Sequence, residues 1–356
     1  METTGFMDDL TKNSPQPLIA LEHVSRQISP SAGIYDVSLD VNQGQILALV
    51  GHTGAGKTSL LNLIAGLDDL DKGRILLSGT DAKRLRPHQR GISMIFQNDV
   101  FYPGRPLEKD WNEAASKGIL NRWNVAGINP QEMLETLQIS ALMLRQKPET
   151  FSGGQARRAS LLRALLQDRP MILADEPLGG LDLWARDRVS RLIWQFIKTT
   201  RKSMIVVVHE PAEAFGLADT IAVLEAGRLL PPGSPEDMIH NPQHIEIARL
   251  LHFPPINDIS QFLAGNGQVI SMVPVKSSWI DFHPDSIGQI KDLMRLRNRT
   301  TQNGNFTEWR CPVSKRIFWT PALANPINHG RLCWENEAVM HFDAATGQRL
   351  PAQPTH

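Results

Sequence analysis

Residues 46–58 read ILALVGHTGAGKT and are the most informative segment of the sequence for the fold class. Residues 46–50 are a continuous aliphatic run, which is typical of a strand that is buried on both faces of a parallel sheet. Residues 51–58 match the pattern G-x-x-x-x-G-K-[ST] in full. Residues 58–66 (TSLLNLIAG) have helical character and end in a glycine stop signal. Because a strand precedes the pattern and a helix follows it, we interpret it as a phosphate-binding loop rather than a glycine-rich turn with a surface lysine.

The chemistry of this loop follows from its residue types. Glycines let the backbone curl until several N–H groups converge on phosphate at a helix N-terminus. The ammonium group of Lys57 would neutralise the charge of the outer phosphate, and the hydroxyl of Thr58 would ligate Mg²⁺. The predicted nucleotide-binding residues of this segment are Gly51, His52, Thr53, Gly54, Ala55, Gly56, Lys57, Thr58 and Ser59.

A second apolar run ends in two acidic residues, since residues 171–176 read MILADE. A carboxylate at such a strand end would lie beside Mg²⁺, usually through a water, so Asp175 is a predicted metal ligand. Glu176 follows directly and is predicted to polarise the attacking water. Acidic residues often end buried strands, and the pair gains meaning because it follows a phosphate loop along the chain.

Residues 151–155 (FSGGQ) resemble the signature of the ATP-binding cassette (ABC) family, usually LSGGQ, with Phe in place of the first Leu. A serine N-cap and two glycines form an anion site at a helix start. The resemblance implies that this turn meets the γ-phosphate of ATP held by the opposite subunit. The residues that it assigns to the nucleotide are Ser152, Gly153, Gly154 and Gln155.

Three further segments resemble ABC elements and follow in the family's order. Residues 96–97 (FQ) are similar to the Q-loop, which implies that Gln97 reaches Mg²⁺ and water and senses a permease. Residues 179–182 (GGLD) are similar to the D-loop, usually SALD, and bring Asp182 to the nucleotide. His209, after the apolar run 204–208, resembles the switch histidine that contacts the γ-phosphate.

The resemblance therefore implies an ATPase that uses ATP and Mg²⁺. Its implied catalytic residues are Lys57, Gln97, Glu176 and His209, and its implied metal ligands are Thr58, Gln97 and Asp175. The family often has an aromatic residue that stacks on adenine, but the matching position falls near Ile28. Tyr35 is the nearest aromatic residue and lies too close to the strand for the usual geometry. We therefore expect adenine to pack against apolar side chains.

The predicted fold is an α/β P-loop NTPase of the ABC cassette type with a parallel core sheet. Residues 18–24 and 34–41 alternate in part and predict an antiparallel β edge layer. The predicted domains are a disordered extension (1–17), a nucleotide-binding domain (18–240) with a helical subdomain (about 98–165), a linker (241–257) and a small β-rich domain (258–356). The Pro/Gly-rich residues 230–235 mark the change. Residues 253–257, 282–287 and 342–350 resemble the linker and parts of the OB-like regulatory barrel of sugar-importer ATPases.

Composition limits the alternatives. The 356 residues carry 37 basic and 37 acidic side chains, so bulk electrostatics do not favour a nucleic-acid partner. The basic run at 295–299 (RLRNR) is most simply a solvated face. Two cysteines make no disulfide framework and favour a reducing compartment. The N-terminal residues lack the apolar core of a secretory signal, and no apolar run is long enough to span a bilayer.

Residues 176–186 and 209–228 are similar to sugar-importer ATPases of the maltose-importer type. That similarity implies a peripheral protein on the cytoplasmic face of the inner or plasma membrane. The implied partners are a second cassette (the same chain or a sister), two transmembrane permease subunits and, indirectly, an external solute-binding protein. A sugar, polyol or glycerol-phosphate-like solute is expected. The alternative is a soluble, non-transport ABC ATPase that acts on a nucleic-acid or ribosomal partner.

Overall fold

The computed structural model describes residues 16–97 and 104–251, and beyond them the segments 257–258, 269–273, 278–281, 290–301, 304–310, 317–321, 329–334, 340–343, 345–346 and 348–350. Its internal contacts divide the chain into two compact units, Met1–Pro235 and Glu236–His356. The predicted N-terminal extension falls almost entirely outside the described residues.

A six-stranded sheet forms the centre of the first unit, with the strand order β10-β9-β3-β8-β7-β6. All pairs in it are parallel except β9 with β10. Each of the strands β3, β7 and β8 has five residues, all of them buried, because helices and a second sheet cover both faces. The strands are β3 (Ile46–Val50), β6 (Ile92–Ile95), β7 (Met171–Asp175), β8 (Ser203–Val207), β9 (Thr220–Glu225) and β10 (Arg228–Leu229). The predicted parallel core sheet is confirmed.

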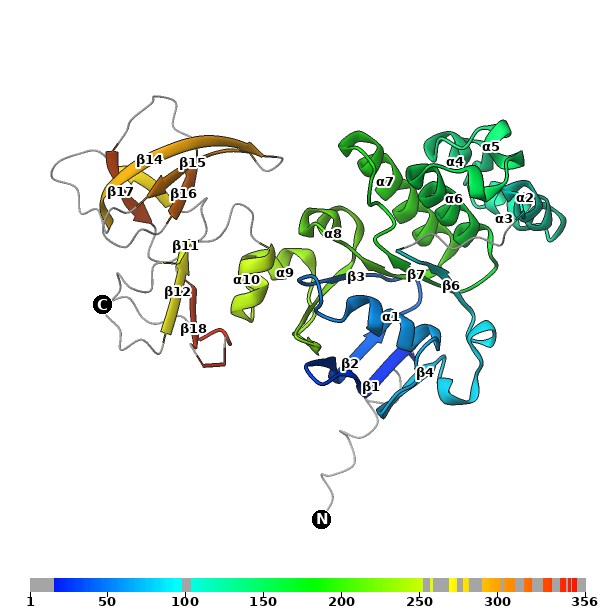
Figure 1. The fold of residues 1–356 in the computed structure, drawn as a ribbon, viewed down its shortest axis with the longest axis horizontal. Helices are drawn as coiled ribbons and strands as arrows, with labels where there is room; N and C mark the ends of the chain where they lie inside the picture. The colour runs from blue at the N-terminus through cyan, green and yellow to red at the C-terminus, as the bar shows by residue number, and fades with distance from the viewer. Residues whose placement is uncertain are drawn as a thin grey trace, which may run out of the picture. The chain divides into compact units, whose positions relative to one another are not determined.

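An antiparallel sheet of order β2-β1-β4-β5 forms a second layer. Its strands are β1 (Ile19–Ser29), β2 (Ala32–Val41), β4 (Lys72–Leu77) and β5 (Thr80–Asp81). One apolar cluster joins the buried faces of β1, β2, β3 and β7 with the buried face of helix α1 (Lys57–Ala65). Figure 1 shows α1 beside these strands. The phosphate loop therefore leads into a helix that both sheets hold in place.

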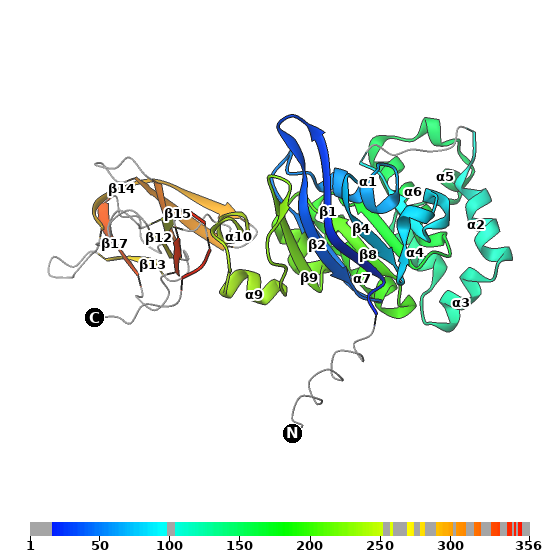
Figure 2. The same cartoon turned by 90° about the horizontal axis from the view of Figure 1, so that it is seen from below.

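Helices α2 to α5 lie together at one end of the first unit in both views (Figures 1 and 2). The helices of this unit are α1, α2 (Leu107–Ser116), α3 (Ile119–Val125), α4 (Pro130–Thr136), α5 (Ala141–Arg145), α6 (Gly153–Leu166), α7 (Leu183–Thr200) and α8 (Pro211–Leu217). None of the helices within the described part of the chain has the length and apolar character that crossing a bilayer requires.

Helix α9 (Pro235–His240) starts at the last residue of the first unit, and α10 (Ile245–Leu251) follows in the second unit, so the predicted linker contains the helix α10. The described strands of the second unit form sheets of order β11-β12-β18 and β13-β17-β14-β15-β16. They are β11 (Asn257–Asp258), β12 (Val269–Val273), β13 (Ser278–Asp281), β14 (Ile290–Thr301), β15 (Gly304–Arg310), β16 (Ile317–Pro321), β17 (His329–Trp334) and β18 (Met340–Asp343). Residues 282–287 lie outside the described residues, and an OB-like barrel stays a prediction.

Candidate nucleotide-binding site

The predicted site residues gather where parallel strands end. Leu49 of β3 and Asp175 of β7 both lie opposite Val207 of β8. The phosphate loop, Glu176 and His209 therefore follow three neighbouring strands at one sheet edge, the usual place for a ligand in an open α/β sheet. Gln97 lies two residues beyond β6, which pairs with β7.

The phosphate loop is shaped by a close backbone contact and by its lysine. A Cβ atom at Gly51 would lie 2.2 Å from the carbonyl oxygen of Leu224, so only glycine fits there. The Nζ of Lys57 donates hydrogen bonds to the carbonyl oxygens of Gly51 (2.7 Å) and His52 (3.1 Å). Thr53 and Gly54 are exposed at the tip of the loop. The loop thus opens to solvent ahead of the N-terminus of α1, which is suited to phosphate.

The electrostatics of the phosphate loop favour an anion beside Lys57. Burial lowers the pKa of Lys57, while the nearby carboxylates of Glu176 and Asp175 act in the opposite direction. A half-buried ammonium group has lost part of its hydration, so phosphate oxygens would restore interactions that water provides elsewhere.

A short hydrogen bond joins the loop to the end of β7. The Thr58 hydroxyl donates to Oδ2 of Asp175 over 2.7 Å. Asp175 is only 2% exposed, and burial raises the pKa of its carboxyl; the Thr58 bond opposes this shift and Glu176 adds to it. A hydroxyl beside a desolvated carboxylate fits Mg²⁺, which binds one or two carboxylates together with waters and phosphate oxygens. Thr58 and Asp175 would hold the cation.

Glu176 has an unusual backbone. Its φ is 50°, in the left-handed region that non-glycine residues rarely adopt. Its N–H donates to the carbonyl oxygen of Val207 (3.1 Å), and its own carbonyl accepts from the N–H of Gly179 (3.1 Å). Strain of this kind, of order 1–3 kcal/mol, persists where the surroundings over-determine it and clusters at functional sites.

His209 is exposed immediately after the buried Val208, whose N–H donates to Leu49. An ion-pair cluster that the sequence did not reveal lies beside it: Arg186 contacts Glu213 (2.9 Å) and Glu210 (3.0 Å). Burial raises the pKa of Glu213, and Arg186 opposes this shift. The cluster connects the start of α7 with the His209 segment.

The signature turn and Asp182 are helix caps. Ser152 and Gln155 form a reciprocal capping box at the start of α6. The Asp182 carboxylate accepts from the N–H of Ala185 at the start of α7 (2.9 Å). Within the described residues, no hydrogen bond or ion pair joins either cap to the phosphate loop of the same chain.

The region predicted for adenine carries a half-exposed aliphatic residue. Ile28, near the end of β1, is 51% exposed. Tyr35 N–H donates to the carbonyl of Gly227 (2.8 Å), and the Gly227 N–H donates to Ala55 of the phosphate loop (3.0 Å). The Arg228 guanidinium lies 5.7 Å from the centre of the Tyr35 ring. Packing of adenine against apolar side chains stays a prediction.

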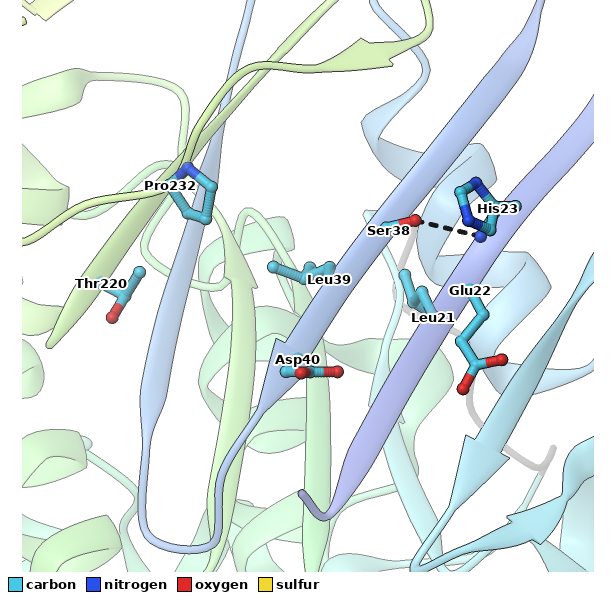
Figure 3. A pocket seen from close by; sticks show the side chains of 8 residues that line it. All are labelled: Leu21, Glu22, His23, Ser38, Leu39, Asp40, Thr220 and Pro232. Atoms are coloured by element: carbon cyan, nitrogen blue, oxygen red, sulfur yellow. Dashed lines mark hydrogen bonds between the residues drawn. The ribbon is translucent and has the colours of Figure 1, made fainter. Parts of the chain in front are cut away.

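A surface hollow of about 570 Å³ lies elsewhere, over β1, β2 and β9 (Figure 3). Leu21, Leu39 and Pro232 are among its lining residues, and the His23 N–H donates to the Ser38 hydroxyl at its rim (3.1 Å). It contains none of the predicted nucleotide-binding residues. The predicted nucleotide-binding residues of the phosphate loop instead lie at the edge formed by β3, β7 and β8.

Together, the fold and the site geometry define a P-loop nucleotide-binding domain. A family model described as ABC transporter matches residues 34–179. Two solved ATP-binding cassettes are similar at 23% sequence identity. A dimeric post-hydrolysis cassette with ADP and Pi has a TM-score of 0.51 over 61% of this chain and 98% of its own. An ATP-binding subunit of an ABC transporter has a TM-score of 0.53 over 62% and 91%.

Curated relatives point the same way. The maltose/maltodextrin import ATP-binding protein MalK of Yersinia pestis is 32% identical over 246 residues, 67% of this chain and 64% of the relative. The putrescine transport ATP-binding protein PotG of Escherichia coli is 30% identical over 65% of this chain and 61% of the relative. The sn-glycerol-3-phosphate import ATP-binding protein UgpC 2 of Agrobacterium fabrum is 29% identical over 94% and 88%. The chain thus spans less than two thirds of MalK and PotG. Residues 34–179 of this chain therefore match the ABC transporter family model, and the relatives that it resembles are import or transport ATP-binding proteins.

Proposed function

We propose that this chain is the ATP-hydrolysing subunit of an ABC importer, peripheral to the cytoplasmic face of the membrane. The observation that carries the proposal is the 2.7 Å bond between Thr58 of the phosphate loop and the buried Asp175. It brings a cation-binding pair next to Glu176, at the edge where His209 also lies.

The chain's own residues suit phosphoryl transfer to water. Lys57 and the loop N–H groups would hold the outer phosphates, and Glu176 would orient and deprotonate the attacking water. Gln97 and His209 would steady the water and the γ-phosphate. Mg²⁺, when bound to Thr58 and Asp175, supplies charge neutralisation across the phosphates. Positioning and electrostatics carry the rate enhancement in such a site.

Two cassettes would complete each site. The caps at Ser152 and Asp182 present helix N-termini without a partner loop in their own chain, within the described residues. A second cassette, either this chain or a sister, would supply the phosphate loop that each turn faces. The composite arrangement makes closure of the dimer depend on ATP.

A permease contact is supported by the helical subdomain. A hollow of about 500 Å³ there is lined by Trp111, Leu134, Ile139 and Leu144, among other residues. Leu142 next to it is 69% exposed. The remaining lining residues are largely polar, and the exposed Leu142 beside them offers an aliphatic contact that a protein partner would bury. We propose two permease subunits as that partner and a sugar, polyol or glycerol-phosphate-like solute, in line with the maltose/maltodextrin and sn-glycerol-3-phosphate import proteins among the relatives.

The test is co-purification of the tagged full chain from its native membranes in mild detergent, with ATPase turnover measured on the same sample. Two polytopic membrane subunits and Mg²⁺-dependent turnover are expected. Recovery with nucleic acid or ribosomal proteins instead would retain the ATPase and refute the importer. Loss of both turnover and ATP binding would refute the proposal entirely.

A further inference from the structure

Arg157, on helix α6, reaches two backbone segments of the candidate site. One guanidinium nitrogen donates to the carbonyl oxygen of Glu176 (3.2 Å), and the other donates to the carbonyl oxygen of Gln97 (2.6 Å). A planar guanidinium can bridge two acceptors in this way, whereas an ammonium is a point charge on a flexible stem. The side chain therefore ties together the residues that follow β6 and β7.

Gly179 makes this approach possible. A Cβ atom at Gly179 would lie 2.4 Å from the Arg157 guanidinium. The N–H of Gly179 also donates to the Glu176 carbonyl, so that oxygen accepts from both residues. Arg157 and Gly179 thus form one packed unit around the left-handed backbone of Glu176.

The position of Arg157 along α6 gives the bridge a second connection. Ser152 caps this helix, and Arg157 follows about one and a half turns later. A ligand on the signature turn is therefore linked through one short, rigid segment to Glu176 and Gln97.

We propose that Arg157 is a positioning residue that holds the backbones of Glu176 and Gln97 for hydrolysis, and that Gly179 is the residue that admits it. This inference rests on the proposed ATPase function. It assigns to Arg157 no contact with ATP or water. Its loss therefore lowers turnover and leaves nucleotide binding in place.

The experiment compares Arg157→Gln, Gly179→Ala and the double variant of the full chain. Measurements are kcat and KM for ATP hydrolysis, the affinity for a fluorescent ATP analogue, and thermal stability. We expect kcat to fall about tenfold to a hundredfold in each single variant, with analogue affinity and melting temperature near wild type. The double variant falls no further than Arg157→Gln, because both changes remove one interaction.

Matched controls separate the bridge from generic effects. Arg84→Gln removes an exposed arginine, and Gly216→Ala adds a methyl group to a helical glycine with no atom within 4 Å of the new Cβ. Both are expected to keep wild-type kcat. Arg157→Lys recovers only part of the turnover, because a single ammonium does not span two carbonyls. If Arg157→Gln does not fold, Gly179→Ala against Gly216→Ala still decides the question.

Three results overturn the inference: wild-type kcat in Arg157→Gln or Gly179→Ala, losses that multiply in the double variant, or parallel losses of kcat, affinity and stability. Each of these requires an active wild-type chain. Absence of both turnover and analogue binding in the wild type refutes the proposed function instead.

Discussion

Lys202 provides a quantitative test of the core of the first unit. It is 9% exposed, donates to the carbonyl oxygen of Gln167 over 2.5 Å, and lies 5.9 Å from the Phe196 ring centre. Burial lowers its pKa from 10.5 to about 8, while Asp168 opposes this shift and Arg122 adds to it. The proposed substitution is Lys202→Met, which keeps an unbranched side chain of similar length and removes the charge.

The sign follows from proton binding. Between pH 8 and 10.5 the unfolded chain keeps the Lys202 proton and the folded chain has lost it, so the wild-type free energy of unfolding rises with pH. At 1.36 kcal/mol per pKa unit the full effect is roughly 3.4 kcal/mol, of which about 2.5 kcal/mol develops between pH 7 and pH 10. Lys202→Met lacks this rise, so its stability relative to wild type falls by that amount over the same interval.

Urea unfolding at several pH values measures the difference. Tryptophan fluorescence follows the unfolding of the chain, and Trp123, one of eight tryptophans, contributes a signal from this region because its ring packs edge-to-face on Phe196 at 5.1 Å. Lys109→Met, at an exposed lysine of α2, is the matched control and shows no such pH dependence. The lowered pKa of Lys202 is refuted if the difference in free energy of unfolding between wild type and Lys202→Met stays constant within about 0.5 kcal/mol from pH 7 to 10.

Three further predictions concern the site and its partners. Thr58→Ala removes the hydroxyl that bonds Asp175 and raises the Mg²⁺ concentration for half-maximal ATPase activity about tenfold or more; an unchanged Mg²⁺ titration contradicts the metal assignment. Ile28→Trp offers adenine a stacking surface and tightens ATP binding about two- to tenfold by calorimetry; unchanged affinity means that adenine lies elsewhere. Leu142→Asp, at a 69% exposed position, keeps isolated ATPase activity but loses the permease in pull-downs, and retained permease contradicts the docking surface.

The sequence predicted the core architecture because its signals are local. The run 46–50, the glycine-rich loop and the helix after it specify β3, the phosphate loop and α1 within a residue of the observed bounds. The run 171–175 specified β7 for the same reason, since continuous aliphatic residues indicate burial on both faces. The cassette fold is confirmed, and residues 34–179 match the ABC transporter family model, whereas the roles of the individual site residues stay predictions.

The remaining features depend on contacts that carry no sequence pattern. The bridge of Arg157 goes to backbone carbonyls, which every residue offers, so residue types could not reveal it. Gly179 matters for the atom that it lacks. Lys202 follows the polar C-terminus of α7. A lysine in such a place is normally solvated, yet tertiary packing buries this one. In the proposed dimer the signature turn meets a second chain, and one sequence does not specify which chain that is.

Glu176→Gln in the full chain tests the proposed ATP hydrolysis most directly, because it keeps the side-chain volume and removes the base. ATP binding, turnover and the sedimentation of the chain with Mg²⁺-ATP would be measured side by side with wild type. If Glu176 is the base in a dimer of cassettes, we expect normal ATP affinity, an ATP-dependent dimer and a loss of turnover of about a hundredfold or more. Near-wild-type turnover in this variant would contradict the role of Glu176 as the base. An ATP-bound chain that stays monomeric would contradict the cassette dimer.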